Sequence, residues 1–183
     1  GALDMGAVPT IYVPEGAKEA YQKAGGWKDF YIMEGEMIPD FTVDEIGFHV
    51  QTDTTVVVSW AQMKELYIPE IVSDGIREYK VPAIMPHLNC DVAFCYNSPY
   101  EKVVIPSTIR SLGDCCFWGA YELHTIVMRS KTPLPFNRAL EPNKSIALYV
   151  PKGSLQAYQE ADGWKKFTIV EGEPVPDFTV DGL

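Results

Sequence analysis

Acidic side chains recur in two sets whose spacing could support chemistry. The sets are Glu34, Glu36, Asp40 and Asp44, and then, with the same spacing, Glu171, Glu173, Asp177 and Asp181. Paired carboxylates can act as a general acid and base, or can bind calcium through their oxygens. Because each Glu-Gly-Glu stretch stands near a proline and recurs together with all of its surroundings, we interpret both sets as solvated turns. The sequence therefore predicts neither a catalytic pair nor a metal ion here.

Four cysteines lie close together in the chain, namely Cys90, Cys95, Cys115 and Cys116. A chain of this length can build a core without a disulfide framework, so buried free thiols are the simplest expectation. His87 could join Cys90 and Cys95 in a metal site, but no second pair of ligands accompanies them. A disulfide bond from Cys90 or Cys95 to Cys115 is the third interpretation.

Histidine, the usual partner of a catalytic nucleophile, occurs at His49, His87 and His124. We expect His124 to be a surface side chain. The sequence has no Gly-x-Ser-x-Gly, His-Glu-x-x-His or glycine-rich phosphate-binding pattern. We therefore predict that the protein is not an enzyme and has no catalytic residue, metal or cofactor.

The charge balance narrows the range of partners. With 15 Lys and Arg against 25 Asp and Glu, the formal net charge is −10. A protein of this charge without a basic run lacks the positive surface that nucleic acids and anionic bilayers attract. The hydrophobic fraction of 46% supports a packed core, and the first residues lack the pattern of a signal peptide. No stretch approaches the roughly 18 apolar residues of a spanning helix. We expect no nucleic-acid partner and no membrane insertion of this segment.

The elements that position these residues are repeated. Residues 2–44 align without a gap with residues 139–181, at an offset of 137, and are identical at 24 of 43 positions. The Tyr-Val-Pro of residues 12–14 recurs at 149–151, and the Gly-Trp-Lys of residues 26–28 recurs at 163–165. The chain thus begins inside one unit and ends as another would start. We interpret it as a window from a tandem array.

A shorter period of 23 residues lies between the two copies. It aligns the Ala-Phe of 93–94 with the Cys-Phe of 116–117, and residues 100–105 with 123–128. This is the length of solenoid coils that contribute one short strand each. Strand alternation turns Val104 and Val127 to an exposed outer face. The residues expected in the stacked interior are Phe94, Val103, Ile105, Phe117, Leu123, Ile126 and Met128.

Residues 104–117, Val-Ile-Pro-Ser-Thr-Ile-Arg-Ser-Leu-Gly-Asp-Cys-Cys-Phe, followed by Leu123 and Ile126, resemble the BspA-type leucine-rich repeat of bacterial surface proteins. Residues 131–136 and 148–167, with their Tyr-Val-Pro-Lys-Gly, Ala-Tyr-Gln and Gly-Trp-Lys-Lys-Phe motifs, resemble the end-piece that closes such solenoids in Bacteroides-type proteins. The resemblance covers about the whole chain. It implies a surface or secreted location and an adhesion-type role, and it names no ligand.

The end-piece is expected to cover the open end of the solenoid. Pro151 ends a strand, a helix spans about residues 154–161, and Gly163 stops it. Aromatic side chains then shield the last coil, although a sugar-binding platform is the other interpretation. The first copy has the same aromatic residues without a coil ahead of it, so we expect its face to pack on a neighbouring molecule or on the following segment. The predicted cap residues are Tyr158, Trp164 and Phe167, with Tyr21, Trp27 and Phe30 as their counterparts.

We predict an α+β, β-rich fold: a short leucine-rich-repeat-like solenoid with a β-hairpin lead-in and helical end caps. Alternation at 41–43 and 48–50 and the β-branched run near 54–60 predict strands, with a turn at 51–53. The Asp-Gly of 74–75 predicts a hairpin between strands 66–72 and 76–81. The expected divisions are an end-cap segment of a preceding tandem unit (1–39), the lead-in (40–80), the coils (81–137), the closing cap (138–176) and the start of the next unit (177–183).

These features predict a non-enzymatic extracellular binding or adhesion module that presents its solenoid surface to a host protein, a matrix component or a glycan. The alternative is a structural spacer in a tandem-repeat stalk on the cell surface, which contacts neighbouring units. Aromatic and arginine side chains are enriched in binding hot spots, although Trp118 could instead shield a coil junction. The candidate contact residues are Tyr96, Lys102, Val104, Trp118, Tyr121, Thr125, Val127 and Arg129.

Overall fold

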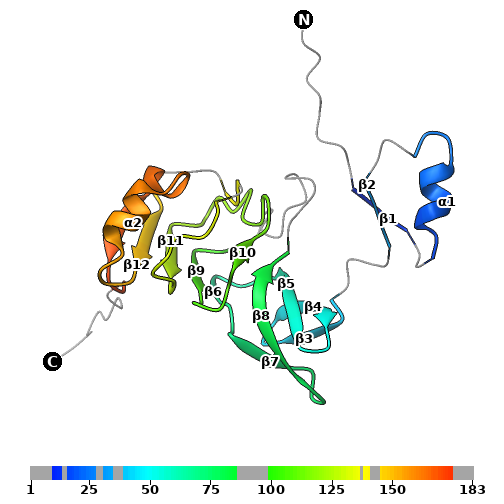
Figure 1. The fold of residues 1–183 in the computed structure, drawn as a ribbon, viewed down its shortest axis with the longest axis horizontal. Coiled ribbons are helices and arrows are strands. Elements are labelled where there is room, and N and C mark those ends of the chain that lie inside the picture. The colour runs from blue at the N-terminus through cyan, green and yellow to red at the C-terminus, as the bar shows by residue number, and fades with distance from the viewer. Residues whose placement is uncertain are drawn as a thin grey trace, which may run out of the picture.

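The computed structural model describes residues 10–13, 16–27, 31–34, 39–85, 99–136, 138–140 and 145–174 of the chain. Short strands dominate these ranges (Figure 1). The two α-helices found there, α1 (Lys18–Lys23) and α2 (Leu155–Glu160), have six residues each. Within the same ranges, no helix reaches the length and apolarity that crossing a bilayer requires.

Five parallel strands form the solenoid sheet. In spatial order they are β6 (Glu65–Tyr67), β9 (Lys102–Ile105), β11 (Thr125–Met128), β12 (Ala147–Val150) and β13 (Thr168–Glu171). The spatial order is also the chain order, so each coil adds one strand beside the previous strand (Figure 1). Val103 pairs with Ile126 and Ile105 with Met128, which confirms the 23-residue coil predicted from the sequence. The stacked coils are therefore a leucine-rich-repeat-like parallel β-solenoid.

Alternate residues of these strands fill the interior of the solenoid. Leu66, Val103, Ile126 and Leu148 share one register position and are buried in the core. Phe94, which the sequence analysis also assigns to this interior, lies outside the described residues. The buried cluster further contains Ile105, Phe117, Leu123, Met128 and Val150.

The lead-in forms a second, mixed sheet. Its order is β10 (Ser111–Leu112), β8 (Glu78–Ile84), β5 (Thr55–Ala61), β4 (Ile46–Thr52) and β3 (Phe41–Val43), and β7 (Ile71–Ser73) also pairs with β8. β3, β4 and β5 are antiparallel neighbours, whereas β8 runs parallel to β5. These strands confirm those predicted at 41–43, 48–50 and 54–60. The turn lies at residues 53–54.

The turn between β7 and β8 is built around Asp74. Its carboxylate accepts hydrogen bonds from the backbone N–H groups of Arg77 (2.7 Å) and Ile76 (2.8 Å) and from the hydroxyl of Tyr79 (2.8 Å). These bonds, that from Arg77 foremost, hold the pKa of Asp74 below its ordinary value. The predicted hairpin is confirmed, but its first strand is not continuous over 66–72. Pro69 lacks an N–H and interrupts it, so β6 joins the solenoid sheet and β7 joins the lead-in sheet.

One hydrophobic core joins the two sheets. Phe48, Val58 and Ile84 of the lead-in sheet belong to the same buried cluster as the interior of the solenoid. The buried Tyr100 donates a hydrogen bond of 2.6 Å to the carbonyl oxygen of Ala61 and so ties the residues before β9 to the end of β5. The lead-in and the coils therefore share one interior.

The end-piece consists of β12, α2, the 3₁₀ turn η2 (Trp164–Lys166) and β13. Its Tyr158, Trp164 and Phe167 are buried. The hydroxyl of Tyr158 donates to the carbonyl oxygen of Ser130 at 2.9 Å, and Nε1 of Trp164 donates to that of Leu134 at 2.7 Å. Both aromatic residues are thus fixed by packing and by a hydrogen bond to the chain segment that precedes the end-piece.

Phe136 completes this aromatic cluster. Its ring meets Trp164 edge-on, with centroids 5.1 Å apart and an interplanar angle of 84°. Gly163 makes room for it, because a β-carbon on Gly163 would lie 2.2 Å from Cγ of Phe136. Gly163 also has a φ of +83°, which residues with side chains rarely adopt.

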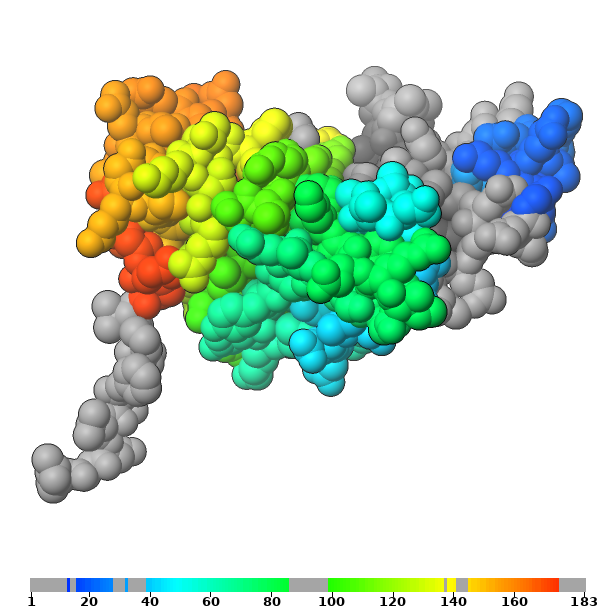
Figure 2. Space-filling model, turned by 60° about the horizontal axis from the view of Figure 1, so that its bottom comes forward, coloured from blue at the N-terminus to red at the C-terminus, as the bar shows by residue number. Residues whose placement is uncertain are grey.

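The first copy of the repeat folds as the second copy does. β1 (Thr10–Val13), α1 and β2 (Tyr31–Glu34) begin and end 137 residues before β12, α2 and β13. β1 and β2 pair in parallel with Thr10 opposite Tyr31, as Ala147 is opposite Thr168. α1 and α2 lie at opposite ends of the molecule (Figures 1 and 2). The repeated sequence therefore specifies the same local fold twice, in two different surroundings.

Candidate binding surface

The outer face of the solenoid sheet carries a row of side chains in register. Tyr67, Val104, Val127, Tyr149 and Val170 occupy one position on five neighbouring strands and are together the outer row. Strand alternation turns this position away from the interior. Because adjacent strands are about 4.8 Å apart, the outer row is about 19 Å long. It crosses all five strands of the solenoid sheet.

The exposure predicted for Val104 and Val127 is wrong. These side chains point away from the core cluster, but they are only 8% and 1% exposed. Each short valine has an outer-row neighbour on both sides, and Tyr67 and Tyr149 stand next to them in register. Larger side chains on adjacent strands therefore cover them, whereas Tyr67 at one end of the row is 52% exposed. The two valines are thus buried in the middle of the row, and its ends, Tyr67 and Val170, are accessible.

Lys102 belongs to a polar network at the β6 end of the outer row. Its Nζ donates to the Tyr67 hydroxyl at 2.7 Å and to Glu65 Oε2 at 3.1 Å, and Tyr67 donates to the same Glu65 oxygen at 2.6 Å. The ammonium also lies 5.0 Å from the centre of the Tyr67 ring. The Tyr67 hydroxyl and then Glu65 raise the pKa of Lys102, and the Tyr67 hydroxyl and then Lys102 lower the pKa of Glu65. This network holds an exposed aromatic ring in one orientation.

Thr125 and Arg129 lie on the same outer face. Arg129 forms an ion pair with Glu173, and Oγ1 of Thr125 is 3.0 Å from Nδ1 of the exposed His124. Partly exposed ion pairs of this kind contribute little to stability because water screens them. They leave the rim of the face polar and close to neutral in charge.

The structure does not bring the other candidate residues to the outer row. Trp118 is half-buried and Tyr121 is exposed, and both lie on the connection between β10 and β11 rather than on a strand of the solenoid sheet. Tyr96 lies outside the described residues. A partner that covers the outer row would therefore reach Lys102, Thr125 and Arg129 before these aromatic residues.

Three members of the outer row were missed by the sequence analysis. Tyr149 lies 22 residues after Val127, and Val170 lies 21 residues after Tyr149. An alignment that allows each coil to be one residue shorter than the previous coil would have found both. Tyr67 lies 37 residues before Val104, and that spacing gives no repeat signal.

A groove runs beside β6, at the edge of the solenoid sheet. It has a volume of about 430 Å³ and lies between β6, β7 and the turn that joins β3 to β4. Its side chains are mainly apolar, and Asp44 and Glu65 are its two carboxylates. Tyr67 belongs both to the groove and to the outer row, so the two features form one continuous surface. The lining residues are Val43, Asp44, Ile46, Met63, Glu65, Tyr67, Pro69, Ile71, Val72 and Ser73.

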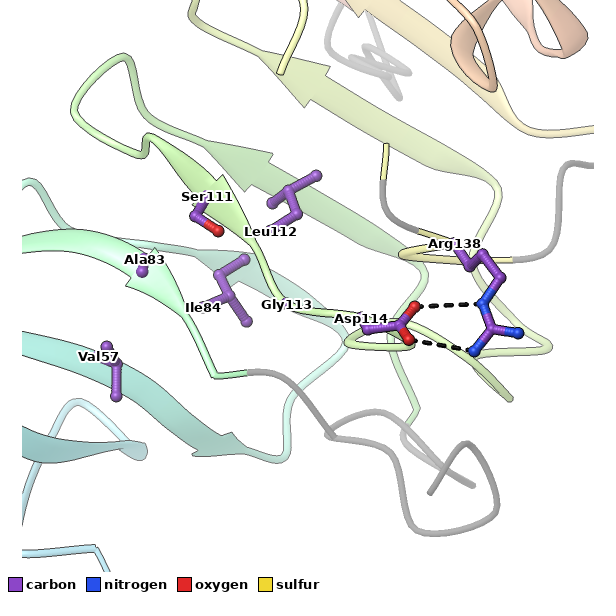
Figure 3. A pocket seen from close by; sticks show the side chains of 8 residues that line it. All are labelled: Val57, Ala83, Ile84, Ser111, Leu112, Gly113, Asp114 and Arg138. Carbon is purple, nitrogen blue, oxygen red and sulfur yellow. Dashed lines mark hydrogen bonds and ion pairs between the residues drawn. The ribbon is translucent and has the colours of Figure 1, made fainter. Parts of the chain in front are cut away.

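A second hollow lies at the edge of the lead-in sheet beside β10 (Figure 3). It has a volume of about 510 Å³, and Val57, Ile84 and Leu112 give it an apolar side. At its other end the guanidinium of Arg138 faces the carboxylate of Asp114, with nitrogen to oxygen distances of 3.1 and 3.4 Å (Figure 3). Asp114 raises the pKa of Arg138. The two charges are paired with each other, which leaves no free charge among them for a ligand.

The two described cysteines differ in state. Cys115 is disulfide-bonded, so the expectation of free thiols is wrong for this residue. Its partner lies outside the described residues, where the sequence offers Cys90 and Cys95. Cys116 is a free and buried thiol whose pKa is raised by desolvation.

Several of the described acidic side chains of the two sets have structural partners. Glu171 accepts the backbone N–H of Gly153 at 2.6 Å, and Asp40 accepts that of Val50 at 2.7 Å. Asp177 and Asp181 lie outside the described residues. Within the part of the chain that the structure describes, no three His, Cys, Asp or Glu side chains gather in a way that could hold a metal ion.

Comparison with known proteins gives likenesses to solved structures. No protein-family model and no curated protein matches the chain. A leucine-rich repeat protein from Bacteroides ovatus ATCC 8483 is 22% identical, with a TM-score of 0.43, over 64% of this chain and 27% of that chain. A leucine-rich cell surface protein from Faecalibacterium prausnitzii A2-165 is 16% identical, with a TM-score of 0.41, over 72% of this chain and 29% of that chain. A leucine-rich repeat protein from Bacteroides capillosus ATCC 29799 is 15% identical, with a TM-score of 0.47, over 73% of this chain and 98% of that chain.

The alignments thus cover less than a third of the first two of these proteins. The strand pairing of the present chain, with one parallel strand for each coil, is itself that of a leucine-rich-repeat-like solenoid.

Proposed function

We propose that this chain is a non-enzymatic binding module that holds a partner protein, a matrix component or a glycan against its outer row. The row itself is the observation that carries the proposal. Tyr67 is an exposed aromatic ring held by hydrogen bonds at one end of the row, and Val170 is exposed at the other end. Side chains that are ordered before binding lose little conformational entropy in the complex, and tyrosine is enriched in binding hot spots.

The proposal includes an extracellular location and a BspA-type kinship. The disulfide bond of Cys115 supports the location, because disulfides persist in oxidising compartments and are rare in the cytosol. The repeat pattern of residues 104–117 and the end-piece motifs support the kinship. The burial of Tyr158, Trp164 and Phe167 supports a role for the end-piece as the cap that closes the solenoid.

Binding to a panel of purified matrix proteins and a glycan array tests the proposal. The double variant Tyr67→Ala with Tyr149→Ala removes both aromatic rings of the outer row. We expect it to lose at least about tenfold in affinity for the component that the wild type binds, as two hot-spot residues would give. Ile76→Ala is the matched control, since Ile76 is exposed on the turn between β7 and β8, away from the row. A double variant that binds as the wild type does, or a panel without any binder, would contradict the proposal.

A spacer unit in a tandem stalk is the second candidate, and the duplication favours it. The same β-α-β fold stands at both ends of the molecule, as a chain of identical links requires. A spacer predicts that tandem units form a rod and that no panel component binds the outer row. Small-angle scattering of a two-unit protein, together with the binding panel, therefore separates the two candidates.

A further inference from the structure

The two copies of the repeat bury their aromatic residues to different extents. Trp164 is 1% exposed, whereas its counterpart Trp27 is 39% exposed. Tyr158 is buried, and its counterpart Tyr21 is only half-buried. The helix α2 buries Tyr158, and α1 buries none of its residues. The strands and the helix have the same bounds in both copies, so the difference in burial reflects what packs against each copy.

Two equivalent glycines, one in each copy, differ in what packs against them. Gly163 has a φ of +83°, and the space of its absent side chain is filled by the ring of Phe136. Gly26 has the equivalent position and a φ of +91°, but no atom lies within 4 Å of the place where its β-carbon would be. The first copy thus keeps the backbone shape that accepts an aromatic ring, and among the described residues no ring lies beside Gly26.

The second copy shows which groups fill such a surface. Ser130 and Leu134 offer the carbonyl oxygens to Tyr158 and Trp164, and Phe136 packs on Trp164. All of these groups come from the stretch 130–136, at the end of the last coil before the copy begins. The chain described here has one such stretch, and the second copy occupies it.

We propose that the first copy caps the coils of another unit of this same chain, joined in tandem ahead of it. Its Tyr21 and Trp27 then pack on that unit's 130–136 stretch, and that unit's Phe136 fills the space beside Gly26. The proposed occupant is a leucine-rich coil of the chain's own kind. The interface is independent of the outer row and of any ligand bound there.

A two-unit protein tests this interface. In it, residues 1–137 are followed directly by residues 1–183, so that Gly1 takes the place of Arg138. Arg138 has a φ of +52°, and glycine adopts positive φ values readily. Trp27→Phe in the first unit leaves one Trp27, at the junction. We expect hydroxyl-radical oxidation of this Trp27 to slow to the rate of Trp164 in the same molecule, whereas Trp27 of the single chain reacts faster than Trp164.

A second variant tests the same fit without a second unit. In the single chain, residues 139–174 are replaced by residues 2–37, which align with them without a gap. We expect this chimera to keep one cooperative unfolding transition. Gly26→Ala in the transplanted copy should lower the unfolding midpoint of the chimera more than Gly26→Ala lowers that of the wild-type chain.

Three outcomes would overturn the inference. The junction Trp27 could keep its single-chain oxidation rate, or the chimera could lose its cooperative transition. Trp27 could also be protected by self-association of the single chain at high concentration but remain reactive in the two-unit protein, which would place the partner in another molecule rather than in tandem.

Discussion

Replacing Gly163 with alanine measures how tightly the end-piece is packed. The new β-carbon would lie 2.2 Å from Cγ and 2.4 Å from Cδ1 of Phe136. A residue with a side chain also pays about 1–2 kcal/mol for a sparsely populated backbone conformation such as this one, with a φ of +83° and a ψ of −53°. Phe136 has little room to retreat because it packs on Trp164 and Phe167, and overpacking of a core costs about 1–3 kcal/mol. We expect the free energy of unfolding to fall by about 2–5 kcal/mol in total.

Gly153→Ala is the matched control for this variant. Gly153 has a φ of +82°, but its β-carbon would meet no atom within 4 Å, so we expect a loss of only about 1–2 kcal/mol. Urea unfolding followed by circular dichroism gives both free energies under the same conditions. Equal losses in Gly163→Ala and Gly153→Ala would refute the reasoning, because backbone strain alone would then account for the first variant.

Three further changes test other parts of the structure. Cys115→Ser should lower the free energy of unfolding by about 3 kcal/mol by opening the disulfide loop. A reductant should lower the unfolding midpoint of the wild type but not that of the variant. An unchanged wild-type midpoint in the presence of the reductant would contradict this. Trp164→Phe should cost about 1–3 kcal/mol, since the buried carbonyl of Leu134 loses its donor, and a loss near zero in urea unfolding would show that the hydrogen bond contributes nothing. Asp74 has a pKa below its unfolded value of 3.8 because of the backbone N–H of Arg77 and its neighbours, so its contribution to stability is complete above that value and is lost as the pH falls through the folded pKa. Asp74→Asn should therefore be less stable than the wild type at pH 7 and should lose less stability between neutral and acid pH, and parallel curves of midpoint against pH would show that the carboxylate charge does not matter.

Much of the fold follows from repetition in the sequence. The 137-residue offset correctly places a strand and a helix in each copy, because the Tyr-Val-Pro and Ala-Tyr-Gln motifs recur with it. The strand that follows the helix in each copy, β2 or β13, was not predicted. The 23-residue period correctly pairs Val103 with Ile126, since identical coil lengths bring equivalent residues into register. The Asp-Gly turn at 74–75 is predicted correctly because its signal is local. The carboxylate of Asp74 accepts a hydrogen bond from the nearby backbone N–H of Arg77, and this bond forms the turn.

The features that sequence reasoning missed depend on neighbours far along the chain. The outer-row valines are covered by tyrosines on other strands, and alternation within one strand cannot show this. β6 joins the solenoid because the single residue Pro69 breaks the predicted strand, while the 37-residue spacing to β9 hides it from a search for regular repeats. Of the candidate contact residues, Lys102, Thr125 and Arg129 lie on the outer face as expected. The binding role of that face is still a prediction.

The agreement between strand order and chain order in the solenoid sheet has a consequence for synthesis. Within this sheet, every strand after β6 pairs with the strand of the sheet that precedes it in the chain, so no coil must wait for a segment that is made later. The shared core supplies β6 as a finished template once the lead-in has emerged, and each later coil closes a loop of only 21 to 37 residues. Assembly can therefore proceed in one direction, from the N-terminal side outward, at the pace of elongation, and adding further units would lengthen the process without slowing any single step.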